Sequence, residues 1–250
     1  MIDEAVVIAG GLGTRICSVM GCVCKQIIRI HGIELFMYPI ISLYRAGVTR
    51  FYIVGNPVNY HLLDNVLNKY SRLLGFEYFL DINPYVETYN GNTALIGLKN
   101  VKNPVFLSVS DHIYPPKLPY LMASENTDAD VVIAGDEKPV LVDVGEATKI
   151  AVNKYSRVKR ISKNLDNYDY IDAGLFIVNN PGKITRLFNI EKPVKLTEIF
   201  SHSELDVRVH GFKGIIWKDI DFFEDLEYVY DSQLGEIVRD TVNYVSKFVK

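Results

Sequence analysis

The first 135 residues alternate between short apolar runs, which favour strands, and segments with the spacing of amphipathic helices. Strands are expected at Glu4–Ala9, Phe51–Val54, Phe76–Leu80, Val105–Val109 and Asp130–Ala134, and helices at Leu35–Ala46, Asn59–Leu74, Thr93–Leu98 and Pro116–Ser124. This alternation predicts a parallel sheet whose two faces are covered by helices. Ligands of such sheets bind beyond the carboxyl ends of the strands, so we expect functional residues there.

After residue 136 the pattern changes to short β-like runs interrupted by helical segments. The runs are Val140–Val152, Arg157–Ile161, Tyr170–Val178, Val207–His210 and Ile215–Trp217, and the helical segments are Pro181–Phe188, Leu196–His202, Phe223–Tyr230 and Ile237–Phe248. We see no linker, repeat or low-complexity segment between the two parts. The sequence therefore predicts a single α/β domain over residues 1–250, with a central, mainly parallel mixed sheet and helices on both faces.

A glycine-rich turn, Gly10–Arg15, follows the first predicted strand. Glycine lets the backbone turn tightly and approach a ligand closely, and successive free N–H groups can cradle phosphate oxygens. The arginine and Lys25 could neutralise the phosphate charge. Ile16 stands where the dinucleotide fingerprint needs glycine, and no Gly-Lys-Ser/Thr follows, so neither that fingerprint nor a Walker loop is present. The turn indicates either a tight structural turn or a phosphate site.

Acidic residues follow two predicted strands. Asp111 comes after Val105–Val109, and Asp219 and Asp221 come after Ile215–Trp217. Such residues are either caps and turn residues or metal ligands. Two acidic strand ends beside a phosphate-binding turn are what a Mg²⁺–triphosphate site requires, because Mg²⁺ binds one or two carboxylates together with phosphates and waters.

The composition narrows the class of protein. Hydrophobic residues make up 48% and charged residues 23%, as in ordinary soluble domains. The net charge of −3 argues against a general nucleic-acid binder. No apolar run reaches the roughly 18 residues that a membrane span needs. The acidic start, Met1–Glu4, differs from the basic opening of a signal peptide, so we expect a cytoplasmic protein.

The three cysteines lie between Arg15 and Lys25, at Cys17, Cys22 and Cys24. Their number is odd, and their spacing fits no standard zinc site, even with His31 added. We therefore expect three reduced thiols, without a catalytic role, in a mobile loop of a cytoplasmic protein.

The glycine turn with Lys25 ten residues beyond its arginine resembles the signature of nucleotidyltransferases that make activated sugars and alcohols. These enzymes join a sugar or polyol phosphate to a nucleoside triphosphate and release pyrophosphate. Further motifs resemble the narrower group of cytidylyltransferases that act on inositol 1-phosphate: Asp111-His112-Ile113-Tyr114, Asp143 to Ile150, Asp172-Ala173-Gly174-Leu175-Phe176, Leu196-Thr197-Glu198-Ile199 and Trp217-Lys218-Asp219-Ile220-Asp221. The chain departs from this family at Cys24 (usually proline), Ser110 (usually glycine) and Phe222 (usually threonine).

The resemblance implies a Rossmann-like fold, a nucleotide-binding half at residues 1–135, and an acceptor-binding half with C-terminal helices at residues 136–250. It implies CTP and inositol 1-phosphate as substrates and Mg²⁺ as cofactor. The implied catalytic residues are Arg15, Lys25, Asp111 and Lys149; the nucleotide contacts are Ala9, Gly10, Gly11, Gly13, Thr14, Asn90, Gly91 and Thr93; the acceptor contacts are Glu146, Lys149 and Asp172; and the metal ligands are Asp111 with Asp219, or with Asp221.

Plain structural roles remain open for some of these residues. The run Asn90–Thr93 is also typical of a turn with a capping residue, and Lys149 is also typical of a solvated lysine on a strand. Two other functions remain open as well: a sugar-1-phosphate nucleotidyltransferase with another nucleotide or acceptor, and a non-catalytic nucleotide-binding subunit. Known relatives often carry a fused membrane phosphatidyltransferase-like domain, so we expect any second step to need a separate membrane enzyme. The sequence does not indicate the oligomeric state.

Overall fold

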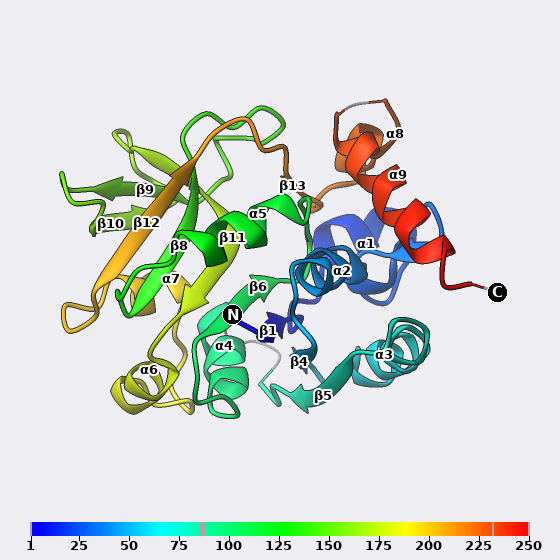
Figure 1. Ribbon diagram of the computed structural model, residues 1–250, viewed down its shortest axis with the longest axis horizontal. Helices are drawn as coiled ribbons and strands as arrows, with labels where there is room; N and C mark the ends of the chain where they lie inside the picture. The colour runs from blue at the N-terminus through cyan, green and yellow to red at the C-terminus, as the bar shows by residue number, and fades with distance from the viewer. Residues whose placement is uncertain (1, 86–88, 232, 250) are drawn as a thin grey trace.

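The computed structural model describes residues 2–85, 89–231 and 233–249, so both ends of the predicted 1–250 domain, Met1 and Lys250, lie outside the described residues. Within the described residues, nine strands form one sheet in the order β10-β9-β11-β6-β1-β4-β5, and β8 joins β11 to β12 (Figure 1). These strands are β1 (Glu4–Ile8), β4 (Arg50–Gly55), β5 (Glu77–Ile82), β6 (Val105–Val109), β8 (Val131–Asp136), β9 (Lys149–Val152), β10 (Val158–Ser162), β11 (Tyr170–Val178) and β12 (Val207–Phe212).

The parallel part of the sheet centres on β1. This strand pairs with β4 on one side and β6 on the other, and β5 continues the parallel ladder beyond β4. All five residues of β1 are buried, as expected for a strand covered on both faces. β11 runs antiparallel to β6, β8 and β9, so the sheet is mixed. The predicted fold class is therefore confirmed.

Helices cover both faces of the sheet (Figure 1). The helices are α1 (Thr14–Met20), α2 (Met37–Arg45), α3 (Tyr60–Leu74), α4 (Asn90–Leu98), α5 (Lys117–Ser124), α6 (Pro181–Leu187), α7 (Leu196–Phe200), α8 (Tyr228–Asp231) and α9 (Gln233–Ser246). Successive side chains of a strand point to opposite faces. Ala5 and Val7 of β1 therefore pack in one apolar core with α2 and α3, whereas Val6 and Ile8 pack in a second core with α4, α6 and α7.

Three sequence-based predictions of local structure were wrong. The segment after Gly13 is not a loop but helix α1, which follows a left-handed glycine (φ 64°) and buries Ile16. Only β9 of the expected Val140–Val152 run is a strand, because the Asp143 carboxylate accepts the Gly145 N–H (2.8 Å) in a local turn. The last paired strand is Lys218–Asp219 (β13) rather than Ile215–Trp217.

The cysteines also differ from prediction. Cys17 and Cys22 form a disulfide, so two of the three expected free thiols are not free. The cause is the end of α1: Gly21 adopts a left-handed conformation, its N–H bonds the Cys17 carbonyl, and the chain turns back so that Cys22 reaches Cys17. Cys24 is a free thiol as predicted, but it is buried rather than in a mobile loop, and burial raises its pKa.

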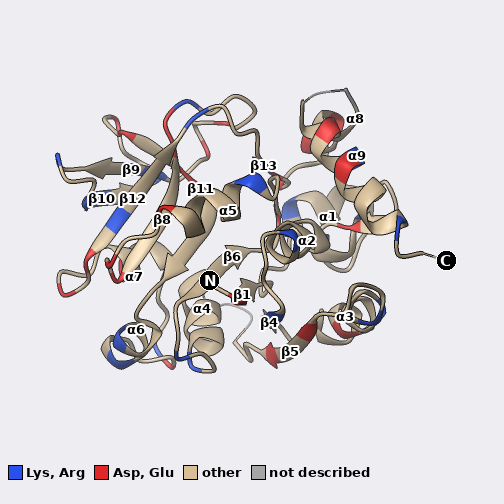
Figure 2. Ribbon diagram, in the orientation of Figure 1, with Lys and Arg blue, Asp and Glu red and all other residues tan. Residues whose placement is uncertain are grey.

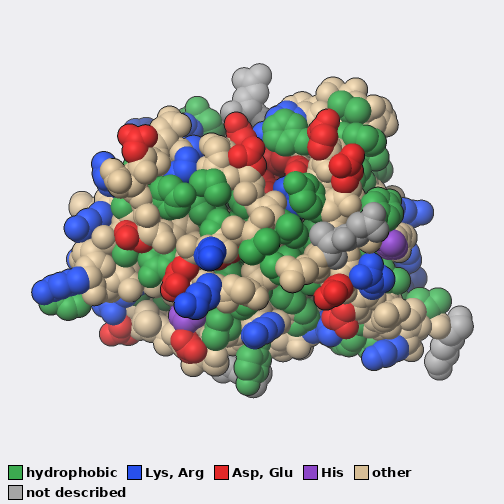
Figure 3. Space-filling model, turned by 90° about the horizontal axis from the view of Figure 1, so that it is seen from above, with side chains coloured by type: hydrophobic (Ala, Val, Ile, Leu, Met, Phe, Trp, Pro, Cys, Tyr) green, Lys and Arg blue, Asp and Glu red, His purple; other side chains and the backbone are tan. Residues whose placement is uncertain are grey.

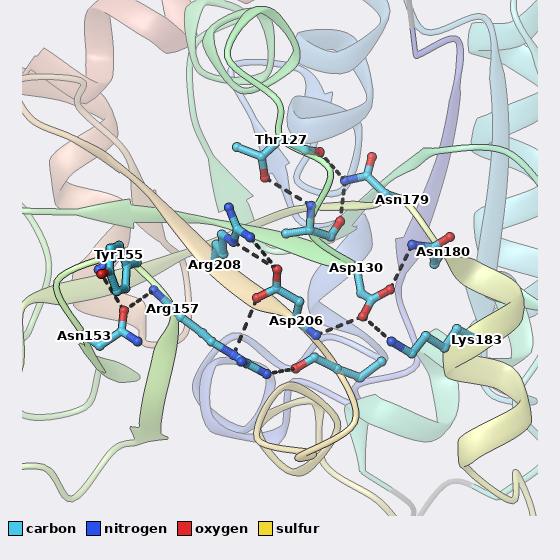
Figure 4. Close-up of polar contacts among 12 residues, drawn as sticks. Thr127, Asp130, Asn153, Tyr155, Arg157, Asn179, Asn180, Lys183, Asp206 and Arg208 are labelled. Carbon is cyan, nitrogen blue, oxygen red and sulfur yellow. Dashed lines mark hydrogen bonds and ion pairs between the residues drawn. The ribbon is translucent and has the colours of Figure 1, made fainter.

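A polar network holds the amino ends of β8 and β12 together (Figure 4). Asp130, just before β8, accepts hydrogen bonds from Lys183 Nζ (2.6 Å), Asn180 Nδ2 (2.9 Å) and the Asp206 N–H (2.9 Å). Arg208 donates in turn to Asp206. β8 runs parallel to β6, because β11 is antiparallel to both. This network therefore lies at the amino ends of the strands, opposite the carboxyl ends of β6 and β1.

Charged residues of both signs are spread over the strands, helices and loops (Figure 2), in agreement with the small net charge of −3. None of the helices in the described part of the chain has the length and apolarity needed to cross a membrane.

Candidate active site

The carboxyl ends of β1 and β6 border a cavity of about 330 Å³, which we call the first cavity. Its polar lining consists of Gly10, Gly11, Gly13, Thr14, Arg15, Lys25, Gln26, Asn90, Thr93, Ser110, Asp111 and Asp221. Most of the predicted nucleotide contacts are therefore brought together. Ala9 and Gly91 are not in the lining: Ala9 is buried at the end of β1, and Gly91 of α4 packs against the Val194 backbone.

A second cavity of about 230 Å³ adjoins the first and shares Asn90, Val109, Asp111 and Asp221 with it. Its other polar lining residues are His112, Glu146, Thr148, Lys163, Asp172, Thr197 and Asp219. Seen from above, acidic side chains gather in the upper middle of the view (Figure 3). Glu146 of loop 139–148, Asp219 and Asp221 are among the acidic residues that line the second cavity. The two cavities meet at Asp111 and Asp221, the carboxylates that follow two of the predicted strands.

Side-chain amides hold the glycine turn in place. Gln26 Nε2 donates to the Gly11 carbonyl (2.8 Å), and Asn56 Nδ2 donates to the Gly10 carbonyl (2.9 Å). A Cβ at Gly10 would lie 2.8 Å from Thr93 Oγ1, and Gly13 has a left-handed φ of +64°. Larger residues would therefore strain the turn or fill the space beside it.

Lys25 lies at the centre of an ion-pair cluster in the first cavity. Its buried ammonium lies 2.6 Å from Asp111 Oδ2 and also contacts Asp221 Oδ1. Asp221 Oδ2 in turn accepts from Arg15 at 2.6 Å. Burial alone would lower the pKa of Lys25 and raise that of Asp111. The attraction of Asp111 and Asp221 instead raises the pKa of Lys25. The attraction of Lys25 and the hydrogen bond of His112 hold the pKa of Asp111 well below its usual range.

The segment that carries Asp221 is anchored by a buried ion pair. Lys218 Nζ lies 2.7 Å from Asp225 Oδ1, and both side chains are largely buried. The second oxygen of Asp225 accepts the N–H groups of Asp221 (2.9 Å) and Phe222 (2.8 Å). Asp225 thus fixes the backbone that presents Asp221 to Lys25.

His112 lies between the two acidic strand ends. Its Nδ1 is 2.8 Å from Asp111 Oδ1, and its residue pairs with Asp219 where β7 (His112–Ile113) meets β13. The imidazole stacks on Trp217, with ring centroids 5.4 Å apart and planes 9° apart. Burial alone would lower the pKa of His112, but the hydrogen bond and charge of Asp111, with Asp219 and Asp172, raise it.

The predicted acceptor contacts separate into two groups. Glu146 and Asp172 line the second cavity, and burial raises the pKa of Asp172 to about 6. Lys149 is not part of that lining, since its amine donates to the Lys163 carbonyl (2.8 Å). Lys163 lines the cavity instead, with its Nζ 3.9 Å from Glu146 Oε2.

Sequence reasoning missed Gln26, His112 and Lys163 as individual site residues. Lys163 lies two residues past the predicted strand Arg157–Ile161, and this position after a strand could have indicated it as a site residue. Gln26 and His112 stand beside predicted site residues, Lys25 and Asp111, but nothing in their spacing shows that their side chains face a cavity.

The acidic residues at the cavity boundary fit a hard divalent cation. The carboxylates of Asp111 and Asp221 already converge on one cationic group, the Lys25 ammonium, and Asp219 lines the second cavity beside them. In the part of the chain that the structure describes, no three His, Cys, Asp or Glu side chains form a complete metal site. Mg²⁺ commonly takes only one or two carboxylates and completes its shell with phosphates and waters.

The model of the nucleotidyl transferase family matches residues 4–227, which include every residue of both cavities. This chain belongs to the nucleotidyl transferase family. Nucleotidyltransferases generally use divalent metal ions, in agreement with the carboxylates described above.

Two curated relatives are named as bifunctional IPC transferase and DIPP synthase. The protein from Thermococcus kodakarensis is 30% identical over 228 residues, which cover 90% of this chain and 49% of the relative. The protein from Archaeoglobus fulgidus is 30% identical over 224 residues, which cover 89% of this chain and 42% of the relative. This nucleotidyl transferase chain thus spans about half the length of the curated relatives it matches, or less.

Among solved structures, the inositol-1-phosphate CTP transferase from T. maritima superposes with a TM-score of 0.84 and 30% sequence identity, covering 96% of each chain. HddC from Yersinia pseudotuberculosis superposes with a TM-score of 0.72 at 20% identity, covering 90% of this chain and 97% of the other. The second match shows that the nucleotidyl transferase fold is shared well beyond the range of clear sequence similarity.

Proposed function

We propose that this protein is a CTP:inositol-1-phosphate cytidylyltransferase, which forms CDP-inositol and pyrophosphate. The observation that carries the proposal is the pair of adjoining cavities that meet at Asp111, one bordered by the glycine turn and one by the acidic second half. The name of the T. maritima structure supplies the identity of the two substrates. A nucleoside triphosphate as substrate also favours a cytoplasmic location.

In this assignment the first cavity holds CTP. The backbone N–H groups of the glycine turn face the triphosphate, and Arg15 and Lys25 add positive charge. Lys25 is held charged by its carboxylate neighbours, so it can serve as a fixed cation at the boundary of the two cavities. Asn90 and Thr93 also line the first cavity, with Thr93 next to Gly10, and are proposed to contact the base or ribose.

The second cavity holds the acceptor. Carboxylates such as Glu146 and Asp172 can accept hydrogen bonds from the hydroxyl groups of a polyol, and Lys163 can pair with the acceptor phosphate. Lys149, through its hydrogen bond to the Lys163 carbonyl, would support that part of the chain from outside the lining.

The reaction needs no protein nucleophile and no general base. An oxygen of the acceptor phosphate, already ionised near neutral pH, attacks the α-phosphorus of CTP. A new P–O bond forms between the acceptor phosphate and the α-phosphorus as the bond to the β-phosphate breaks. The electron pair of the broken bond leaves with pyrophosphate. Cations aimed at the triphosphate stabilise the charge that grows on the leaving group, and alignment of the two substrates supplies much of the acceleration.

Asp111, with Asp219 or Asp221, would hold Mg²⁺ at the boundary between the cavities. When bound there, the ion would neutralise charge on the α-phosphate and so reduce its repulsion of the incoming acceptor phosphate.

Pyrophosphate release tests the proposal. Each of CTP, UTP, GTP and ATP is combined with inositol 1-phosphate or a hexose 1-phosphate, with Mg²⁺. We expect release with CTP and inositol 1-phosphate; release only with another pair would keep the family and refute these substrates. In the same assay, Asp111→Asn should lower turnover at least about a hundredfold, because an amide is a poor Mg²⁺ ligand. Comparison of Asp219→Asn with Asp221→Asn identifies the second ligand, and exposed Asp166→Asn serves as control.

A further inference from the structure

The contacts of His112 reach both cavities, yet the reaction outlined above gives this side chain no task. It lines the second cavity, and it hydrogen-bonds Asp111, which lines both. Its main-chain partner across the β7–β13 ladder is Asp219. The imidazole therefore lies at the junction where metal and both substrates would meet.

The direction of the hydrogen bond between His112 and Asp111 follows from the charge on the carboxylate. Asp111 Oδ2 lies 2.6 Å from the Lys25 ammonium, and a carboxylate in such an ion pair can only accept hydrogen bonds. Nδ1 of His112 must therefore carry a proton and donate it to Asp111 Oδ1 at 2.8 Å. The other carboxylate oxygen, Oδ2, faces the Lys25 ammonium at 2.6 Å. Each oxygen of Asp111 thus has its own partner, and the carboxylate cannot rotate freely.

The imidazole ring is itself held by its neighbours. It stacks nearly parallel on Trp217, whose indole N–H donates to Asp136 Oδ2 at 2.8 Å. On another side it contacts Gly174, where a Cβ would come within 2.8 Å of the imidazole Cδ2. Gly174 also has a left-handed φ of +70°, so a larger residue would be strained there as well as crowded. Such contacts on several sides are typical of a side chain that has to present one atom in a fixed direction.

We propose that His112 is a positioning residue: its Nδ1–H fixes the Asp111 carboxylate in the orientation that binds the divalent metal. The role rests on the proposed function, because it takes Asp111 as a metal ligand. This role explains why His112 directly follows Asp111 and why its ring stacks on Trp217, the chain's single tryptophan. Hydrogen-bond partners of metal ligands typically change metal affinity or activity by 10–100-fold when they are removed.

Two variants of nearly the same shape test this role. His112→Leu and His112→Asn both remove the imidazole and its stacking on Trp217, but only asparagine keeps an N–H donor close to the position of Nδ1. Binding of Mn²⁺ in the presence of CTP is titrated by electron paramagnetic resonance, and kcat and both KM values are measured with Mg²⁺. His61→Leu, on the exposed surface of α3, serves as control, and thermal melting shows that each variant is folded.

We expect His112→Leu to weaken Mn²⁺ binding and to lower kcat, each by about tenfold or more, with little change in KM for CTP. His112→Asn should recover most of both losses. Equal losses in the two variants would overturn the proposal, because the ring and not its N–H would then matter; so would a His112→Leu variant that behaves like the wild type. A wild-type protein that binds no Mn²⁺ and releases no pyrophosphate from any substrate pair would instead refute the proposed function, and the role of His112 with it.

A further measurement does not depend on any variant. Long-range ¹H–¹⁵N NMR spectra distinguish which ring nitrogen of a histidine carries the proton. We expect a protonated Nδ1 in His112, and an Nδ1 without a proton would overturn the proposal.

Discussion

Asp172 shows how burial changes the chemistry of one side chain. It lies on β11 in the wall of the second cavity, where its Oδ1 accepts the Gly174 N–H at 2.8 Å. Burial raises its pKa to about 6, against an ordinary value of 3.8, even though this hydrogen bond and the nearby His112 act in the opposite direction. The folded protein therefore holds a proton on Asp172 at pH values where the unfolded chain has lost it.

This difference predicts a pH dependence of stability. Between about pH 4 and pH 6 the folded state binds more protons at Asp172 than the unfolded state, so the free energy of unfolding falls as the pH rises through this window. Asp172→Asn should remove this part of the slope and should be at least as stable as the wild type at pH 7. Urea unfolding at several pH values measures this slope of the free energy of unfolding, with the exposed variant Asp166→Asn as control. An unchanged slope in Asp172→Asn would contradict the raised pKa.

At the scale of elements, helix α1 depends on its surroundings. It has seven residues, too few for a stable isolated helix, and it is the element that carries Arg15 toward Asp221. Two features close its end: the left-handed Gly21 and the disulfide between Cys17 and Cys22, which lie five residues apart. The disulfide thus ties the end of α1 to the segment that leads into Lys25.

We expect Cys17→Ser to lower stability by about 2 kcal/mol, the chain-entropy value for so short a closed loop. For a chain of this size that corresponds to about 4–8 °C in Tm. Calorimetry with and without a thiol reductant checks the cause: reductant should lower the Tm of the wild type and leave that of Cys17→Ser unchanged. Cys24→Ala, which keeps the disulfide, should still respond to the reductant. Equal responses of wild type and Cys17→Ser would show that the disulfide does not stabilise the protein.

At the scale of the whole molecule, the fold joins two halves of the chain around one carboxylate. The first cavity is built mainly from residues before 112, and the second mainly from residues after 140, with Asp221 returning to the boundary. Since each substrate is assigned to one cavity, substitutions in the second half should change acceptor binding much more than CTP binding.

Lys163 tests this division. Lys163→Ala should raise KM for inositol 1-phosphate about tenfold or more and leave KM for CTP nearly unchanged, because a cation facing only the acceptor phosphate is lost. Lys149→Ala should have a smaller effect, since its amine bonds the Lys163 carbonyl rather than facing the cavity. Lys159→Ala, on the exposed part of the same hairpin, is the matched control. If Lys149→Ala has the larger effect, Lys149 is the phosphate contact; if either variant weakens CTP alone, the division into two halves is wrong.

The amino-acid sequence by itself determined the alternation of strands and helices, the glycine turn after β1 and the acidic residues after β6. These features are local: hydrophobic periodicity and the conformational freedom of glycine act over a few neighbouring residues. Together with the family resemblance, they were sufficient to predict the mixed sheet and most of the residues that line the first cavity, including Arg15, Lys25 and Asp111.

Only the tertiary structure decided which distant side chains meet. Lys25 contacts Asp221 across 196 positions of sequence, and Trp217 contacts Asp136 across 81. Neither pairing leaves a local pattern, because each depends on how the sheet and its connections fold in space. The same reason explains why Lys163 rather than Lys149 lines the second cavity, and why Cys17 reaches Cys22: side-chain direction is set by backbone turns at Gly21 and in the β9–β10 hairpin, which residue types alone do not specify.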